Sequence, residues 1–234
     1  MTALAFKGVV KDYRGMRPLR IADFSVALGE RVAVSGLDAP AAETFINLAT
    51  GAGLPDEGEV LVMGEPTSAI ADGERWLASL DRFGVVSHRA VLLESATVAQ
   101  NIAMSYSLAI DPIPADIRAK VDALAAAVGL APGSVDVSLA SAGPAAKVRT
   151  HLARALSIDP KIIVLEHATL GVPREDVPAL AASILRAVEG LDVAFVALSD
   201  DDVLSKGLKA RRLKLDGGTG VLRGRVYSFP WSKE

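Results

Sequence analysis

The chain has no cysteine among its 234 residues, and histidine occurs only three times. Disulfides and thiolate chemistry are therefore excluded, and any metal site would depend on histidine and carboxylates. There is no basic excess either, because the formal net charge is −3. The composition thus gives no sign of a nucleic-acid partner or of an anionic membrane surface.

Long hydrophobic runs are also missing, since the longest apolar stretches fall far short of the roughly 20 residues of a membrane span. The N-terminal MTALAFKGVVKDY has no basic segment followed by a long apolar stretch, so we expect no signal peptide and a cytoplasmic location. Any membrane association must then go through a partner. Half of the residues are hydrophobic, which is ample for a sizeable core.

Apolar periodicity divides the chain into alternating strands and helices. Strand-like alternation occurs at residues 4–13 and 20–28, and short apolar runs predict strands at 29–36, 58–66, 83–88, 161–168 and 192–200. Helical spacing covers residues 39–50, 97–109, 114–130, 143–160 and 175–191, and the tail, 204–229, predicts a short helix and a hairpin. This order predicts an α/β fold with a mostly parallel core sheet flanked by helices, preceded by antiparallel strands.

Ligands of open α/β sheets bind at the carboxyl ends of the strands. Those ends fall at residues 35–44, 87–89, 166–169 and 198–200. The flanking segments LGERVAVSG, PDEGEVLVMGE, ATVAQNIA and ARALSIDPKIIVLEHAT together resemble the ATP-binding cassette (ABC) ATPases, from Phe6 to about Gly224. The resemblance implies one P-loop NTPase-like domain over 1–234. Residues 1–35 and 58–66 would contribute to an antiparallel β subdomain, 90–142 would form a helical subdomain, and the remainder would form a RecA-like core.

The phosphate-binding loop departs from the family pattern G-x-x-G-x-G-K-[ST]. Gly36 matches, whereas Ala42 fills the lysine slot, Glu43 fills the Mg²⁺-binding serine slot and Thr44 fills the next place. Lysine normally places a cation on the β- and γ-phosphates, and the glycines let backbone N–H groups surround them. Asp38 adds a second carboxylate where phosphates would bind.

The other slots of the resemblance are changed as well. Glu166 replaces the magnesium-linked aspartate, His167 replaces the glutamate that polarises the attacking water, His88 replaces a glutamine and Ser199 replaces a histidine. In the signature motif, which caps the partner's nucleotide, Gly143 fills the serine slot and Ala145 the second glycine slot. Tyr13 stands where the family has an aromatic that stacks on adenine, although a strand-end aromatic packed on the β region is the interpretation we favour.

Asp38 also has a local structural role to play. It precedes a predicted helix, with Pro40 in the first turn, and can act as its N-cap. Glu43 lies within reach of the same exposed N–H groups and of the positive helix end. We therefore expect these carboxylates to satisfy the donors that a phosphate would otherwise take, and to repel ATP.

Together the changed slots predict a degenerate member of the family, a pseudo-ATPase with no catalytic residue, no metal and no cofactor. It would act as scaffold or regulator, as a homo- or heterodimer with another ABC-like chain, on an integral membrane transporter subunit at the inner face of the membrane. One alternative is a divergent active ATPase with Glu43 and Glu166 on Mg²⁺ and His167 as base. Another is a stand-alone module that reuses the cleft for a different ligand. The region from Asn101 to Leu130 resembles that of the MCE-type lipid transporter ATPases.

Overall fold

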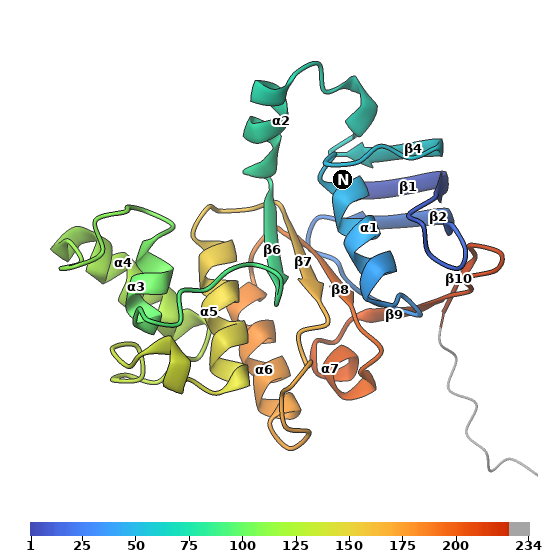
Figure 1. Cartoon of the computed structure of the whole chain (residues 1–234). Coiled ribbons are helices and arrows are strands. Elements are labelled where there is room, and N and C mark those ends of the chain that lie inside the picture. The colour runs from blue at the N-terminus through green and yellow to red at the C-terminus, as the bar shows by residue number, and fades with distance from the viewer. Residues whose placement is uncertain (225–234) are drawn as a thin grey trace, which may run out of the picture.

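Two sheets and the helix between them organise residues 1–224, which the computed structural model describes (Figure 1). The antiparallel sheet has the order β2-β1-β4-β5, with β1 Thr2–Lys11, β2 Leu19–Ala27, β4 Glu57–Val62 and β5 Glu65–Pro66. The core sheet has the order β10-β9-β3-β8-β7-β6, with β3 Arg31–Ser35, β6 Phe83–Ser87, β7 Ile162–Glu166, β8 Ala194–Leu198, β9 Arg211–Leu215 and β10 Leu222–Gly224.

The core sheet is parallel except for its last pair. β3 pairs in parallel with both β8 and β9, β7 pairs in parallel with β6 and β8, and β10 runs antiparallel to β9. All residues of β7 and β8 are buried. Apolar, β-branched runs such as IIVL in β7 suit a strand that is covered on both faces. The predicted α/β class with a parallel core and an antiparallel β region is therefore confirmed.

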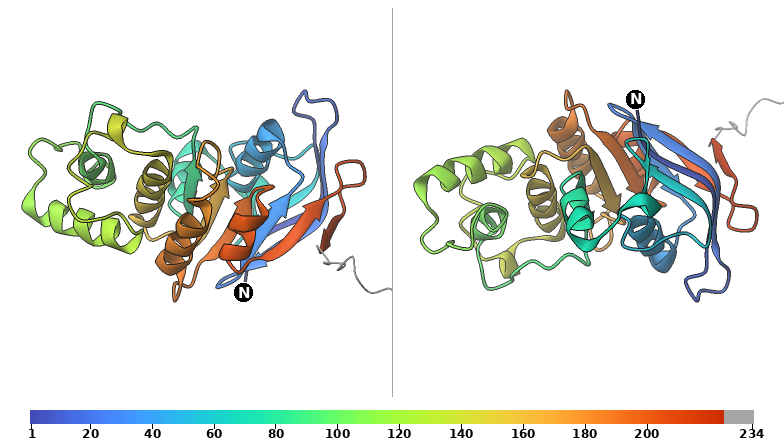
Figure 2. Two further views of the ribbon diagram at one scale, coloured as in Figure 1. Left: turned by 90° about the horizontal axis from the view of Figure 1, so that it is seen from below. Right: turned by 90° about the horizontal axis from the view of Figure 1, so that it is seen from above.

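Helices cover the core sheet on both sides. The helices of residues 1–224 are α1 Ala39–Ala49, α2 Gly73–Leu80, α3 Val98–Ala103, α4 Ala115–Ala127, α5 Pro144–Leu156, α6 Val177–Val188 and α7 Asp202–Gly207, with 3₁₀ turns η1 Thr67–Ala69 and η2 Leu139–Ser141. Figure 2 shows α3 and α4 at one end of an elongated molecule and the antiparallel sheet at the other. The helix expected over 97–109 is shorter, because α3 ends at Ala103, and α2 has no counterpart among the predicted elements.

The helix α1 is held between the two sheets by aromatic side chains. Phe45 stacks on Phe6 of β1 with ring centroids 4.5 Å apart, and it meets Phe24 of β2 edge-on at 5.6 Å. All three rings are at most 2% exposed. Aromatic contacts of these geometries add to the free energy gained by burying the rings. They fix the helix that follows the phosphate-loop segment.

The short helix and hairpin predicted for the C-terminal residues 204–229 are present up to residue 224. α7 supplies the short helix, and β9 and β10 form a hairpin around the turn at Asp216–Gly220. The part of the predicted hairpin from residue 225 to 229 lies outside the described residues. Among residues 1–224, no helix combines the length and the apolar character needed to cross a membrane.

Candidate nucleotide site

Four strand ends meet at one edge of the core sheet. Ser87, the last residue of β6, is in register with Glu166, the last residue of β7. Glu166 is in turn in register with Leu198 of β8, and Leu198 with Val34 of β3. The loops that follow these strands therefore lie side by side at this edge, which is where the sequence places the candidate site residues.

The loop after β3 closes on carboxylates of the protein itself. The backbone N–H of Gly36 donates to Oδ1 of Asp200 at 2.9 Å, and the N–H of Ala41 donates to Oδ1 of Asp38 at 2.9 Å. Asp38 is the N-cap of α1, with a proline in the first turn, so the predicted cap is confirmed. Ala42, in the lysine slot, is fully buried, and the Thr44 hydroxyl donates to the Pro40 carbonyl at 2.8 Å.

Gly36 is held by a close approach of two backbones. Its φ is +89°, and a Cβ at this position would lie 2.7 Å from the carbonyl oxygen of Leu215 in β9. Both the dihedral angle and the lack of space restrict the position to glycine.

Glu43 has a different partner from the one expected. Its Oε1 lies 2.7 Å from Nη1 of Arg89, the second residue after β6, and the expectation that it serves the first N–H groups of α1 is wrong. Arg89 also donates from Nε and Nη2 to Oε2 of Glu166, at 3.1 and 3.0 Å. One guanidinium therefore joins the carboxylate in the phosphate loop to the carboxylate at the end of β7.

The Glu166 carboxylate is fully buried, and its two oxygens are in different surroundings. Oε2 accepts from Arg89 and from the Ser87 hydroxyl at 2.5 Å, whereas Oε1 is buried without a hydrogen-bond partner. The backbone N–H of Arg89 donates to the same Ser87 hydroxyl at 3.1 Å. Ser87 and Arg89 thus orient Glu166 and leave one oxygen free.

His167 follows Glu166 in a tight turn with φ +42°, a backbone region in which histidine is more common than most residues. Its Nε2 is buried without a partner. His167 lines a hollow of about 450 Å³ together with His88, Ser199 and the first residue of α1. The Ser199 hydroxyl accepts the N–H of Asp201 at 3.1 Å.

A second hollow, of about 360 Å³, lies between the loop after β6 and α5. It is lined by Arg89, Glu166 and all three histidines of the chain. Burial lowers the pKa of His151, on α5, from 6.5 to about 4, with smaller contributions from Arg154 and His88. The His151 imidazole is therefore neutral in the folded protein near pH 7.

Tyr13 lies near the phosphate loop. Burial raises the pKa of its phenol, and the negative charge of Asp38 raises it further, so the hydroxyl lies within electrostatic reach of the N-cap. The ring also packs in part against the core cluster that contains Phe45. Both predicted roles, packing on the β region and stacking on a base, remain compatible with this position.

The signature slots lie at the start of α5. Gly143 is the N-cap of α5 and Ala145 lies in its first turn. α5 and α1 are on opposite sides of the core sheet (Figure 1). The fold therefore gathers Gly36, Asp38, Glu43, Thr44, His88, Glu166, His167 and Ser199 at one edge. Gly143 and Ala145 flank Pro144, which lines the 360 Å³ hollow together with His88, Glu166 and His167.

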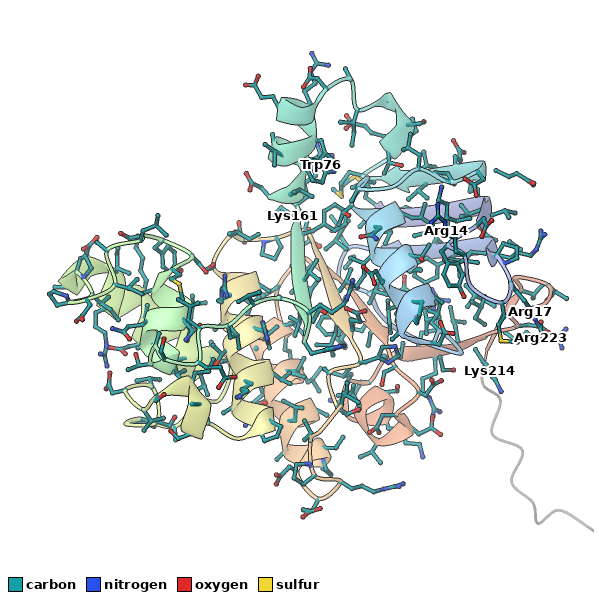
Figure 3. The ribbon with its side chains drawn as sticks, in the orientation of Figure 1. Arg14, Arg17, Trp76, Lys161, Lys214 and Arg223 are labelled. Atoms are coloured by element: carbon teal, nitrogen blue, oxygen red, sulfur yellow. The ribbon has the colours of Figure 1, made fainter. Side chains whose placement is uncertain are left out.

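Positive side chains near the loop come from outside α1. Besides Arg89, Lys214 of β9 pairs in register with Ser35 and with Arg223 of β10. The Arg17 guanidinium approaches the turn at Gly218, and Figure 3 shows Arg17, Lys214 and Arg223 together beside the β9–β10 hairpin. A buried alanine in the lysine slot thus does not leave the region without cations.

The carboxylates of the site also suit Mg²⁺. This ion is commonly held by one or two protein carboxylates together with substrate phosphates. Glu43 and Glu166 are two such carboxylates, both paired with Arg89, and the unpartnered Oε1 of Glu166 is an oxygen free to act as a ligand. No group of three or more histidine and carboxylate side chains able to hold a metal occurs among residues 1–224, so phosphates would have to complete the coordination.

Replacing Asp38 separates its effect on the stability of α1 from the effect of its negative charge on ATP binding. Asp38→Ala removes the N-cap and should lower the free energy of unfolding by about 1 kcal/mol, whereas Asp38→Asn keeps a capping oxygen and should change it by a few tenths. Both variants remove a negative charge from the loop, so both should bind ATP more tightly than the wild type. Urea unfolding and calorimetric titration measure the two effects. Equal stability losses in both variants would contradict the capping role.

The chain is similar to curated import proteins along most of its length. It is 28% identical over 227 residues to the methionine import ATP-binding protein MetN of Bradyrhizobium diazoefficiens, covering 94% of the chain and 65% of that protein. It is 30% identical over 226 residues to MetN of Caulobacter vibrioides, covering 95% of the chain and 67% of that protein. The chain thus spans about two thirds of the length of these relatives. No protein-family profile matches it.

A solved structure confirms the architecture. The ATP-binding cassette MJ0796, described as a dimer in a post-hydrolysis state bound to ADP and Pi, superposes with a TM-score of 0.75 at 19% identity, covering 96% of this chain and all of that one. This likeness concerns the fold. The P-loop NTPase-like fold predicted from the resemblance is therefore confirmed.

Two predictions from the sequence are wrong, namely that the chain is a non-catalytic pseudo-ATPase and that it takes no cofactor. Both relatives carry the names of ATP-binding import proteins. The physical reason for the error is that the lysine slot alone does not describe the charge of the site, because Arg89 brings a guanidinium to it from the end of β6. The identity and coverage of the Caulobacter relative, with the cassette fold, show that the chain belongs to the family of ABC transporter ATP-binding proteins.

Proposed function

We propose that the chain is a divergent ABC ATPase that energises import of a small solute across a membrane. The observation that carries this proposal is the arrangement at the strand ends, where Arg89 joins Glu43 of the phosphate loop to Glu166 of β7. This places a cation and two magnesium-type ligands at the edge where the fold binds nucleotides. Methionine, named for the relatives, is the first solute to test.

Glu43 and Glu166 would hold the Mg²⁺ of the nucleotide. When bound, Mg²⁺ supplies positive charge to the phosphate oxygens, which is a large part of phosphoryl-transfer catalysis. The Gly36 and Ala41 N–H groups would bind phosphate oxygens once Asp200 and Asp38 release them. Phosphate binding therefore competes with carboxylates that already satisfy the loop.

His167 is the residue best placed to accept a proton from the attacking water. Its Nε2 is buried without a partner, and the side chain lines the hollow beside the first turn of α1. A neutral imidazole nitrogen can accept a proton from water that lies within hydrogen-bond reach. His167 would thus act in the slot that a glutamate occupies in the family pattern.

The assembly follows from the same proposal. The chain would dimerise, as the MJ0796 cassette does in its post-hydrolysis structure, and would bind an integral membrane transporter subunit at the inner face of the membrane. That subunit would carry the solute across the bilayer, and this chain would supply the ATPase. We further propose that residues 1–234 act as a single domain.

Phosphate release from ATP tests the function. The purified chain with Mg²⁺, alone and with its membrane subunit in vesicles, should release phosphate above background, and His167→Asn should lower the rate by about tenfold or more. Asparagine tolerates the left-handed backbone of this position, so the variant should remain folded. Background rates in both preparations, or a wild-type rate in His167→Asn, would refute the proposed roles.

A further inference from the structure

Four carboxylates surround the candidate nucleotide site. Asp38, Glu43, Glu166 and Asp200 all contact the loop or the strand ends around it. Like charges brought together in this way weaken the binding of an anion unless cations compensate. The lysine slot of α1 holds a buried alanine, so compensation has to come from another element.

We propose that Arg89 is the phosphate-binding cation of this site, reaching from the loop after β6 to Glu43, the residue next to the lysine slot. This inference rests on the proposed function, because it assigns a residue to the same nucleotide. It concerns this chain's own geometry, in which the guanidinium lies between Glu43 and Glu166.

The guanidinium has donors to spare. An arginine carries five N–H donors in a planar fork that matches phosphate oxygens. Arg89 uses Nε and Nη2 toward Glu166 and Nη1 toward Glu43, one contact from each nitrogen. Since Nη1 and Nη2 each carry two hydrogens, each keeps one N–H for a further acceptor. With its side chain 35% exposed, Arg89 can offer these donors to a ligand without leaving its carboxylates.

The position of the guanidinium is set before any ligand arrives. The backbone N–H of Arg89 and the Glu166 carboxylate share the Ser87 hydroxyl, and Glu166 is fully buried. A fork fixed in this way loses less rotamer freedom when it binds phosphate than a free side chain would. The same contacts leave Oε1 of Glu166 unpartnered, so Glu166 can keep Oε2 on Arg89 and still offer Oε1 to a magnesium ion.

A purely structural role for Arg89 makes a different prediction. If Arg89 only neutralises the buried Glu166, its loss would lower stability and would leave nucleotide affinity unchanged in the fraction that stays folded. Arg118 provides the matched control. It is 36% exposed and pairs with two carboxylates, Asp122 and Asp136, in the α4 region away from the strand ends.

The test is a calorimetric titration of the full-length protein with ATP, with Mg²⁺ and with a chelator. Arg89→Ala should weaken ATP binding by about tenfold or more, Arg89→Lys should recover part of the loss because it keeps the charge without the fork, and Arg118→Ala should bind as the wild type does. Glu43→Gln should act in the opposite direction with the chelator and strengthen binding, because it removes one negative charge and releases Nη1.

The outcomes separate this inference from the proposed function. In one outcome the wild type binds ATP and Arg89→Ala binds it with the same affinity, at temperatures where circular dichroism shows the variant folded. That outcome would overturn the role of Arg89 and leave the ATPase proposal standing. Absence of ATP binding by the wild type, with or without Mg²⁺, would overturn both. Equal losses in Arg89→Ala and Arg118→Ala would also overturn it, since the effect would then be general.

Discussion

Phe45→Ala is expected to lower the free energy of unfolding by about 3–5 kcal/mol, because it removes a buried ring and leaves a cavity. Phe45 is 1% exposed and contacts Phe6 and Phe24 from the two longest strands of the antiparallel sheet. Phe45 is the one aromatic residue of α1, and it packs against the antiparallel sheet together with the buried aliphatic side chains of the helix. The loss can be measured as a lower urea midpoint with an unchanged slope.

Two further variants test whether the loss in Phe45→Ala comes from removing a buried ring. Phe45→Leu keeps much of the apolar volume and should cost less than half as much as alanine. Leu77→Ala, on α2, removes an apolar side chain that is 61% exposed and should change the unfolding free energy by at most about 0.5 kcal/mol. A loss below about 1 kcal/mol for Phe45→Ala would show that the aromatic cluster does not secure α1.

Acidification below pH 6.5 should destabilise the protein through His151. Its pKa is lowered from 6.5 to about 4 in the folded state by burial, then by Arg154 and His88. Between pH 6.5 and about 4, His151 binds a proton in the unfolded chain but not in the folded protein. The free energy of unfolding therefore falls as the pH drops through this range. At 1.36 kcal/mol for each unit of pKa difference, the full loss is about 3 kcal/mol.

His151→Leu isolates this contribution. The variant has no imidazole to titrate, so its stability should fall less steeply than that of the wild type between pH 6.5 and 4, while the two curves should run parallel above pH 7. Chemical unfolding at a series of pH values gives both curves. Parallel curves over the whole range would mean that His151 is protonated equally in the folded and unfolded states.

Local patterns predicted the frame of the molecule well. The buried strands at residues 161–168 and 192–200 appear as β7 and β8, because continuous apolar runs have few other stable placements. The cap at Asp38 was equally predictable, since an aspartate followed by a proline in the first turn is a local signal. The helix α2 was missed because none of its residues is buried, although Asp72, which accepts the N–H of Arg75 at 2.8 Å, marks its start.

The chemistry of the site was less predictable, because its decisive contacts join distant parts of the chain. Glu43 is close in sequence to the N–H groups of α1, yet its partner is Arg89. The strands β4, β5 and β6 lie between these two residues in the sequence. The only sequence signal for Arg89 was its place within residues 87–89, just beyond a strand end. Comparing the phosphate loop with the family pattern, position by position, shows that the lysine is missing. It cannot show that Arg89, from the loop after β6, supplies a cation instead.

Gly36 shows a constraint of another kind. The loop has exchanged nearly every group that distinguishes the family pattern, with alanines at two of its glycine positions, but it has glycine where a Cβ would meet the Leu215 carbonyl oxygen at 2.7 Å. That requirement comes from the neighbouring strand β9 and does not depend on what the loop binds. The other side chains of the loop can be replaced as the chemistry of the site diverges. Gly36 has to stay a glycine, because β9 leaves no space there for a side chain.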